Sequence, residues 1–326
     1  MSLNGSEKEF LFTLFLKQNK QILEKELQLN IEDIALEKPF NRMKIDMYGI
    51  DYNSGVEIFV ENLLYKSNDS HQSKILKMVE MIDQGIIVYQ ALDFQQKHIV
   101  ELHEAVKSSS KPINLYLSRI NADILIPLEM LNRMHKLKVY ENLNLLAIEN
   151  PIQFLEKESI VQPIKGDKVF VRKKGFDFSK REDRNAYLLK SLREKIPYFL
   201  PFHREKANLD TIRVLSFGAG RSDCNYFVSI SDRRNMAFVE LRFSENNSPI
   251  YNAIKKKEDI VRGKIGKDVA FRDNSIALEF KHHGDVEETV NRLADIFEKM
   301  ILAFANYIYY FDEDKREMWK YHKEGI

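Results

Sequence analysis

Two strand-like segments on either side of a tight turn constrain this chain more than any other feature. Arg42–Tyr48 and Val56–Glu61 have the composition of strands, and the segment between them, Asp51–Gly55, reads Asp-Tyr-Asn-Ser-Gly. Turn formers between two such runs predict a β-hairpin. Asp46 lies on its first strand and Glu61 at the end of its second, so the chain is expected to carry carboxylates on adjacent strands.

The expected register brings these two carboxylates to one end of the hairpin. With the turn centred near Asn53, Asp46 lies opposite Val60 and beside Glu61. Two hard oxygen ligands are what Mg²⁺ or Mn²⁺ needs beside a scissile phosphate. The bound ion polarises the phosphoryl oxygen and lowers the pKa of an attacking water. The hairpin therefore predicts a metal-dependent phosphodiesterase site, and the alternative is a pair of solvated surface acids.

The elements around the hairpin predict an α/β domain over residues 1–150. A helix is expected before the hairpin, over Glu7–Leu29, and alternating strands and helices after it. These are a helix ending near Gly85, a strand over Ile86–Ala91, a helix over Gln95–Val106, a strand over Ile113–Ile120, a short helix over Pro127–Leu137 and a last strand over Asn144–Glu149. The βαβαβ order implies parallel pairing. The expected sheet is therefore mixed, with an antiparallel hairpin joined to a parallel extension.

The rest of the chain predicts a linker and a second domain. Residues 151–184 have a weak pattern with a short strand over Lys168–Val171, and 185–326 predict an α+β domain, an antiparallel sheet packed with helices. Its expected elements are a helix over Asn185–Lys195, strands over Thr211–Phe217, Asn225–Ser231 and Met236–Phe243, a helix over Pro249–Val261, a hairpin over Val269–Lys281, and a long amphipathic helix from Asp285.

Composition excludes several other classes of protein. The 326 residues carry a net charge of +1, which argues against a wholly basic coat. A single cysteine, Cys224, rules out an intrachain disulfide and a cysteine-based zinc site. The apolar run Phe10–Leu16 is too short to span a bilayer. A cytoplasmic protein without a membrane segment is expected.

The hairpin resembles the pattern of the PD-(D/E)xK nucleases. That pattern has an Asp, a hairpin, and then Glu-x-Lys at the end of the next strand. Asp46 and Glu61 match it, whereas Leu63 stands where the lysine would be. The resemblance implies a restriction-endonuclease-like fold, a Mg²⁺ or Mn²⁺ cofactor and DNA as the partner.

A narrower resemblance is to an uncharacterised bacterial family that joins an N-terminal restriction-endonuclease-like domain to a C-terminal domain of unknown function. Val60–Leu64 reads Val-Glu-Asn-Leu-Leu where family members read Ile-Glu-Asn-Gln-Leu, and Lys66, Ser67 and His71 follow. Four segments of the second half also fit: Ser216–Gly220, Val239–Leu241, Ile250–Gly266 and the last helix, from Asp285. The resemblance covers most of the chain.

A lysine from elsewhere could replace the one missing at Leu63. Lys44 shares the strand face of Asp46 and is the first candidate, Lys74 on the following helix is the second, and Lys66 lies in the loop. An upstream helix acid could complete the metal site. Glu26 is the residue expected there, with Glu32 and Asp33 as alternatives.

Other basic residues are weaker candidates for nucleic-acid contact. They are His71, Lys66 and the run Lys255, Lys256 and Lys257. For the lysine run, the alternative is the solvated face of a helix. The aromatic stretch Tyr307–Phe311 predicts a core or a homodimer interface.

Two functions follow from these patterns. The first is a divalent-metal-dependent nuclease acting on DNA, in defence against foreign DNA, with a degenerate third position at Leu63. The second is a catalytically inactive nucleic-acid- or protein-binding module, or a structural dimer, on the same fold.

Overall fold

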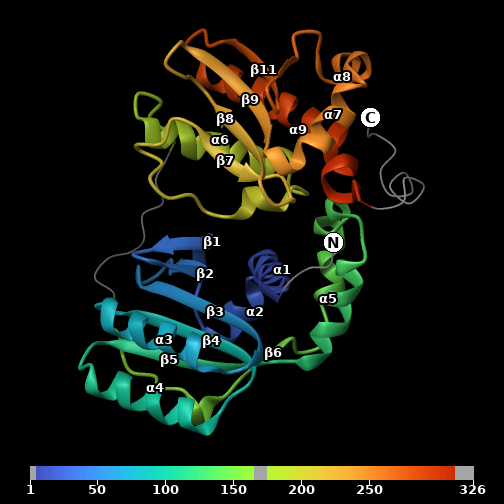
Figure 1. The fold of residues 1–326 in the computed structure, drawn as a ribbon. Helices are drawn as coiled ribbons and strands as arrows, with labels where there is room; N and C mark the ends of the chain where they lie inside the picture. Colours follow the sequence, from blue (N-terminus) through green and yellow to red (C-terminus); the bar gives the residue numbers. More distant parts are fainter. Residues whose placement is uncertain (1–4, 165–174, 313–326) are drawn as a thin grey trace.

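The chain folds around two β-sheets. The computed structural model describes residues 5–164 and 175–312. The first sheet has the six strands β1-β2-β3-β4-β5-β6 in that order, and the second has five, in the order β10-β11-β9-β8-β7 (Figure 1). The architecture is thus α/β, with a mixed sheet in the first half and an antiparallel sheet in the second.

The first half contains α1 (Gly5–Gln18), α2 (Gln21–Leu27), β1 (Ile31–Phe40), β2 (Met43–Asp51), β3 (Glu57–Lys66), α3 (Asp69–Met81), β4 (Gly85–Asp93), α4 (Gln96–Ser108), β5 (Ile113–Ile120), α5 (Leu125–Asn132) and β6 (Ile152–Phe154). Strands β1, β2 and β3 pair antiparallel, β3, β4 and β5 pair parallel, and β6 returns antiparallel to β5. The hairpin is therefore joined to a parallel βαβαβ extension.

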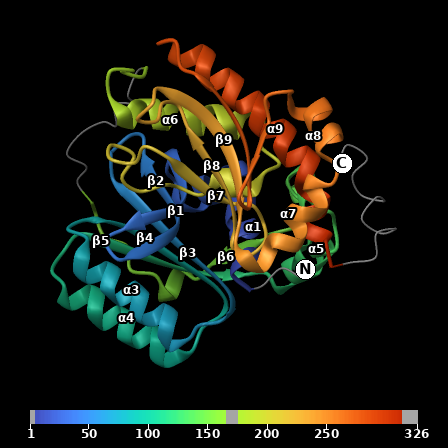
Figure 2. The same ribbon diagram turned by 45° about the horizontal axis from the view of Figure 1, so that its top comes forward.

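The first sheet is covered on both faces, because side chains alternate along its strands. Ile58, Val60 and Leu64 of β3 lie in the apolar cluster that includes α1. Phe59 and Leu63 lie in the opposite cluster, which includes α3 and α4. Figures 1 and 2 show α3 and α4 together on the side of the sheet away from α1.

Strand β1 is an addition to the sequence-based expectation. The predicted helix over Glu7–Leu29 is two helices, α1 and α2, and the chain then enters an edge strand rather than an irregular segment. The β1–β2 register shifts between Glu32 and Ala35, and Asp33 and Glu37 have positive φ. These irregularities break the period of two by which strands are detected in a sequence.

The strand predicted over Asn144–Glu149 is wrong. Tyr140–Leu146 is a 3₁₀ helix that buries Leu143 and Leu146, a spacing of three that fits such a helix. The sixth strand is instead β6, and Ile160 bridges to Leu115. Pairing with the first sheet thus continues into the predicted linker. The strand predicted over Lys168–Val171 lies outside the described residues.

The second half contains α6 (Arg181–Lys195), β7 (Leu215–Gly218), β8 (Cys224–Ser229), β9 (Met236–Phe243), α7 (Ser248–Lys255), α8 (Glu258–Ile265), β10 (Ala270–Arg272), β11 (Ser275–Lys281) and α9 (Val286–Tyr310). All its strand pairs are antiparallel. The helix predicted over Pro249–Val261 is interrupted, giving α7 and α8. The apolar face of α9 lies in the core of this half.

The two halves contact each other directly. Lys136 donates its backbone N–H to the Tyr310 hydroxyl on α9 over 3.1 Å. The rings of Tyr140 and His203 stack with centroids 5.2 Å apart. The end of α9 therefore packs within the chain, and the homodimer remains a prediction. Across residues 5–164 and 175–312, no helix is long and apolar enough to cross a membrane.

Candidate active site

The hairpin register differs by one residue from the expectation. Met47 pairs with Val60, and the loop closes through the Asp51 N–H and the Val56 carbonyl. The turn therefore centres between two residues rather than on one. Extended by one step, this register places Asp46 opposite Glu61, so the two carboxylates share a sheet face.

Glu61 is buried on the face that α3 covers. Its side chain is only 1% exposed, and Lys74 of α3 donates a hydrogen bond to its Oε2. Its Oε1 has no hydrogen-bond partner among the described residues. Burial, and then the charge of Asp46, raise the pKa of Glu61 well above its usual range, and Lys74 opposes the shift. A buried carboxyl with one free oxygen and a shifted pKa is typical of a functional site.

Asp46 completes a triangle with Glu61 and Lys74. Its Oδ2 accepts the backbone N–H of Asn62 over 2.8 Å, and its Oδ1 lies 3.8 Å from Lys74 Nζ. Its side chain remains 27% exposed. Burial raises the pKa of Asp46, while Lys74 and the Asn62 N–H lower it. The site is therefore open to solvent on the Asp46 side.

A third carboxylate, Glu9 on α1, belongs to this cluster and escaped the sequence analysis. Its Oε1 accepts the backbone N–H of Leu64 over 3.2 Å. Burial raises the pKa of Glu9, the Leu64 N–H lowers it, and the charge of Asp46 raises it further. One turn later, Thr13 accepts from the Asn62 amide over 2.8 Å, which fixes α1 against β3. The sequence signal for this residue was weak: Glu9 precedes the polar residue Thr13 by one helical turn on an otherwise apolar helix face.

Of the candidate lysines, the structure brings Lys74 to the carboxylates. Lys44 is 68% exposed and pairs with Glu37 over 3.5 Å. Lys66 is 57% exposed and pairs with Asp93 over 3.3 Å. Both point to other partners, so neither supplies the missing charge.

The acids expected to complete the site lie elsewhere. Glu26 is exposed on α2, and the structure records no contact between it and Asp46 or Glu61. Glu32 and Asp33 belong to β1, with Glu32 facing Lys20 over 3.5 Å. Because α2 is a separate short helix, its acidic residues do not continue along the helix face by which α1 reaches the end of β3.

Leu63, the position of the missing lysine, is 1% exposed in the apolar cluster beneath α3 and α4. Lys74 comes from α3, so the helix that covers Leu63 also provides the ammonium group. His71 lies one turn before Lys74 on α3. Burial lowers the pKa of His71, whereas Asp46 raises it, so His71 is an electrostatic neighbour of the site.

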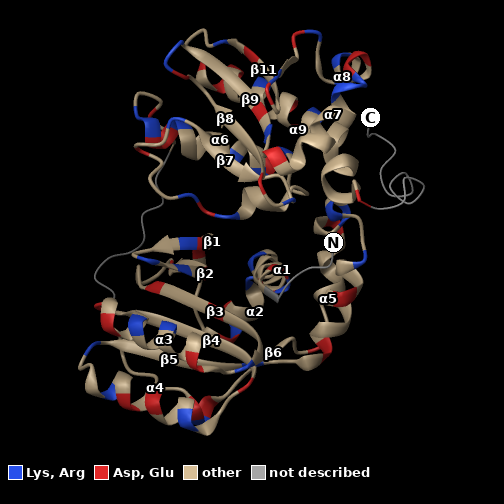
Figure 3. Ribbon diagram, viewed as in Figure 1, with Lys and Arg blue, Asp and Glu red and all other residues tan. Residues whose placement is uncertain are grey.

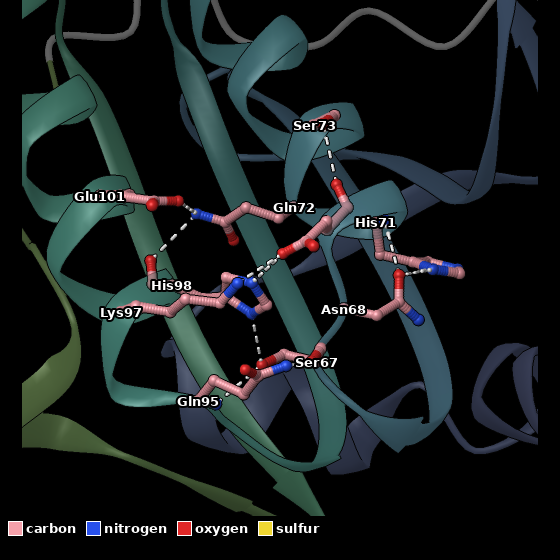
Figure 4. Close-up of polar contacts among 10 residues, drawn as sticks. Ser67, Asn68, His71, Gln72, Ser73, Gln95, Lys97, His98 and Glu101 are labelled. Carbon is pink, nitrogen blue, oxygen red and sulfur yellow. Dashed lines mark hydrogen bonds and ion pairs between the residues drawn. The ribbon is translucent and has the colours of Figure 1, made fainter.

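A hydrogen-bond network holds the start of α3 in place (Figure 4). Asn68 caps the helix by accepting the His71 N–H over 3.0 Å. Ser67 Oγ bonds to His98 Nδ1 over 2.8 Å, and His98 Nε2 to Asp69 over 2.9 Å. This Ser-His-Asp chain is not a hydrolase triad, because Ser67 and His98 are buried while the Asp69 side chain is 83% exposed. It fixes α3 against α4, and so positions Lys74.

The cluster fits a divalent cation that two carboxylates hold. No group of three or more His, Cys, Asp or Glu side chains within residues 5–164 and 175–312 could together hold a metal ion. Mg²⁺, however, is commonly bound by one or two carboxylates with waters and substrate phosphate as the other ligands. The unpartnered Glu61 Oε1 and the half-buried Asp46 carboxylate meet this need.

The predicted basic run lies in the second half, where Lys255 ends α7 and Lys256 and Lys257 lead into α8. Lys255 Nζ lies 5.7 Å from the Tyr251 ring centroid and Lys257 Nζ 5.3 Å from that of Tyr307. Lys256 is exposed. In Figure 1 this segment is far from β3 and α3.

Comparison with known proteins gives limited matches. No family model and no curated protein matches the chain. A repair endonuclease from Pyrococcus abyssi aligns at 20% identity and a TM-score of 0.25, over 32% of this chain and 45% of that one. Pyrococcus furiosus SfsA in complex with Ca²⁺ aligns at 20% identity and a TM-score of 0.23, over 32% of this chain and 57% of that one. The chain thus spans about half the length of each of these structures.

Proposed function

We propose that this protein is a divalent-metal-dependent phosphodiesterase that cleaves DNA at the Asp46–Glu61–Lys74 site. The observation that carries the proposal is that Lys74, from α3, reaches both carboxylates of the hairpin. This restores an acid-acid-lysine set at a sheet end although Leu63 occupies the usual lysine position. Unrelated acids would not be expected to converge on one partly buried ammonium group.

Each residue has a separate role in this proposal. Asp46 and Glu61 would hold Mg²⁺ or Mn²⁺, which when bound polarises the phosphoryl oxygen and activates water. Lys74 offers an ammonium group that stabilises the charge developing on the phosphate. Glu9 adds negative charge beside Asp46 and favours cation binding. The exposed side of Asp46 leaves room for the phosphate to approach.

The proposal is tested by cleavage of supercoiled plasmid and single-stranded circular DNA in Mg²⁺ or Mn²⁺. The full chain is compared with Asp46→Ala and with Asp123→Ala, an equal change of charge at an exposed residue of the first half. We expect Asp46→Ala to lose at least about 100-fold in rate, and Asp123→Ala to cut like the parent. A pure parent protein that cuts neither substrate in either metal would overturn the proposal, as would undiminished cleavage by Asp46→Ala.

One observation favours a second function, a catalytically inactive nucleic-acid-binding module. The Lys74 ammonium already contacts Glu61 and lies near Asp46, so it neutralises the position that a metal ion would take. In that case the parent protein binds no Mn²⁺ in a calorimetric titration and cuts no DNA. Mn²⁺ binding that disappears in Asp46→Ala would exclude this alternative.

A further inference from the structure

Among the described residues, the helices of the second half share one apolar cluster with a single face of its sheet. Along β9, Val239 and Leu241 point into the core that contains α9. Phe238, Glu240 and Arg242 alternate with them and therefore lie on the opposite face. On this opposite face Phe238 and Glu240 are buried, whereas Arg242 is exposed, so arginine side chains can meet a partner there.

Arginines line a groove on this face. A hollow of about 510 Å³ is lined by Arg213, Arg233, Arg234, Arg242 and Arg272, together with carboxylates and Phe238. A smaller hollow of about 160 Å³ adjoins it, because both include Arg213 and Asp232, and adds Arg181 and Arg184. Figure 3 shows basic residues spread over the strands and loops of this sheet.

The positive charge of the groove is only partly neutralised. Arg234 and Arg272 share Glu279, at 3.0 and 2.9 Å. Arg242 pairs with Glu240 over 2.6 Å and covers the ring of Phe227 at 4.3 Å. These pairs hold the guanidinium groups in place along the floor.

Of the other arginines, Arg181 bonds to the backbone carbonyls of Asp210 and Thr211 rather than to a carboxylate. Arg184, Arg213 and Arg233 have no carboxylate within ion-pairing distance in the part of the chain that the structure describes. Arg213 and Arg233 are exposed, and Arg184 is partly so. Guanidinium groups bind phosphates through paired hydrogen bonds, which makes a row of them suited to successive phosphates.

We propose that this arginine groove binds the phosphate backbone of a nucleic-acid strand. The groove lies on the second sheet, separate from the carboxylate site on the first. The inference does not depend on cleavage at Asp46 and Glu61. It also replaces the run Lys255–Lys257 as the contact surface of the second half, since two of those lysines lie over aromatic rings and none lines the groove.

The test measures binding without cleavage. Asp46→Ala protein in EDTA is titrated into a fluorescein-labelled single-stranded oligonucleotide, and into its duplex, while anisotropy is recorded at several salt concentrations. The groove variant is Arg184→Gln/Arg213→Gln/Arg233→Gln, which leaves no carboxylate without its partner. The matched control, Lys25→Gln/Lys107→Gln/Arg133→Gln, removes the same charge from exposed positions of the first half.

We expect the groove variant to bind at least about tenfold more weakly. The slope of log K against log salt should also be smaller, corresponding to about two to three fewer counterions released on binding. The control variant keeps the parent affinity, and unfolding by circular dichroism shows that both variants are folded. Parent protein that binds neither oligonucleotide, or a groove variant that binds like the control, would overturn the proposal. Groove-dependent binding without metal-dependent cleavage supports the arginine groove and counts against the nuclease. Metal-dependent cleavage without groove-dependent binding supports the nuclease and counts against the arginine groove.

Discussion

Lys74 on α3 donates a hydrogen bond to Glu61, a carboxylate thirteen positions earlier on β3 that is otherwise sealed from solvent. The same ammonium lies 3.8 Å from Asp46. One cation therefore joins a helix to two adjacent strands, and it competes with any metal ion for the same carboxylates.

Replacing Lys74 by methionine is expected to separate chemistry from metal binding. The cleavage rate should fall by about 100-fold or more, because the ammonium that stabilises developing charge is gone. Mn²⁺ affinity should stay or increase, because the competing cation is removed. Rates and calorimetric titrations test both points, with Lys66→Met as the control. Loss of rate and of Mn²⁺ binding together would instead indicate that Lys74 only holds the carboxylates in place.

Glu9 is expected to act on the metal site without contacting substrate. Glu9→Gln keeps an oxygen that can accept the Leu64 N–H but removes the charge beside Asp46. Loss of such a supporting group should weaken Mn²⁺ binding by about tenfold. Glu26→Gln, on the exposed face of α2, should bind Mn²⁺ like the parent. Equal affinities for both variants would remove Glu9 from the site.

The hairpin was predictable because its alternation and turn residues are local signals. Asp46 and Glu61 follow directly from it, and Lys74 was among the candidates because α3 follows β3 immediately. The register was off by one residue, since a loop closed between Asp51 and Val56 centres between two residues. Sequence spacing cannot distinguish these loop types.

Glu9 and the arginine groove could not be predicted, because both depend on how distant segments pack. Glu9 reaches β3 only because α1 docks through Thr13 and Asn62. The groove gathers arginines from α6, from loops and from two strands of the second sheet, β9 and β10. The edge strand β1 was missed for a different reason, as residues with positive φ interrupt its alternation.

The stability of the protein is expected to fall in mild acid because of His203. This side chain is 6% exposed, bonds through Nε2 to the Pro197 carbonyl over 2.7 Å, and stacks on Tyr140. Burial lowers the pKa of His203 to about 4. The unfolded chain, with the ordinary pKa of about 6.5, then binds more protons than the folded chain below that pH. Stability is therefore complete above about pH 6.5 and is lost as the pH falls towards about 4.

Urea unfolding of the parent and of His203→Gln at about pH 7.5 and about pH 5 measures this effect. The parent should lose about 2 kcal/mol more than the variant between the two conditions. Carboxylates that titrate in the same range contribute equally to both proteins, so their contribution cancels when the two losses of stability are compared. Equal losses of stability in the two proteins would show that the pKa of the His203 imidazole is not lowered by folding.

Gly220 is expected to be irreplaceable, unlike its neighbour Gly218. Its φ is +101°, and a Cβ added there would overlap the Tyr309 ring of α9. Gly218 has no atom within 4 Å of an added Cβ. Gly220→Ala should therefore lose about 3 kcal/mol of stability through backbone strain and overlap, whereas Gly218→Ala should lose less than about 1 kcal/mol.

Urea unfolding of both alanine variants measures these losses, and a double variant divides the Gly220 effect into its two causes. Tyr309→Ala removes the ring that an alanine at 220 would strike, so Gly220→Ala should cost less in that background, and the part that remains is backbone strain. A cost that is the same with and without the ring would mean that the conformation of Gly220, and not its contact with α9, makes glycine necessary there.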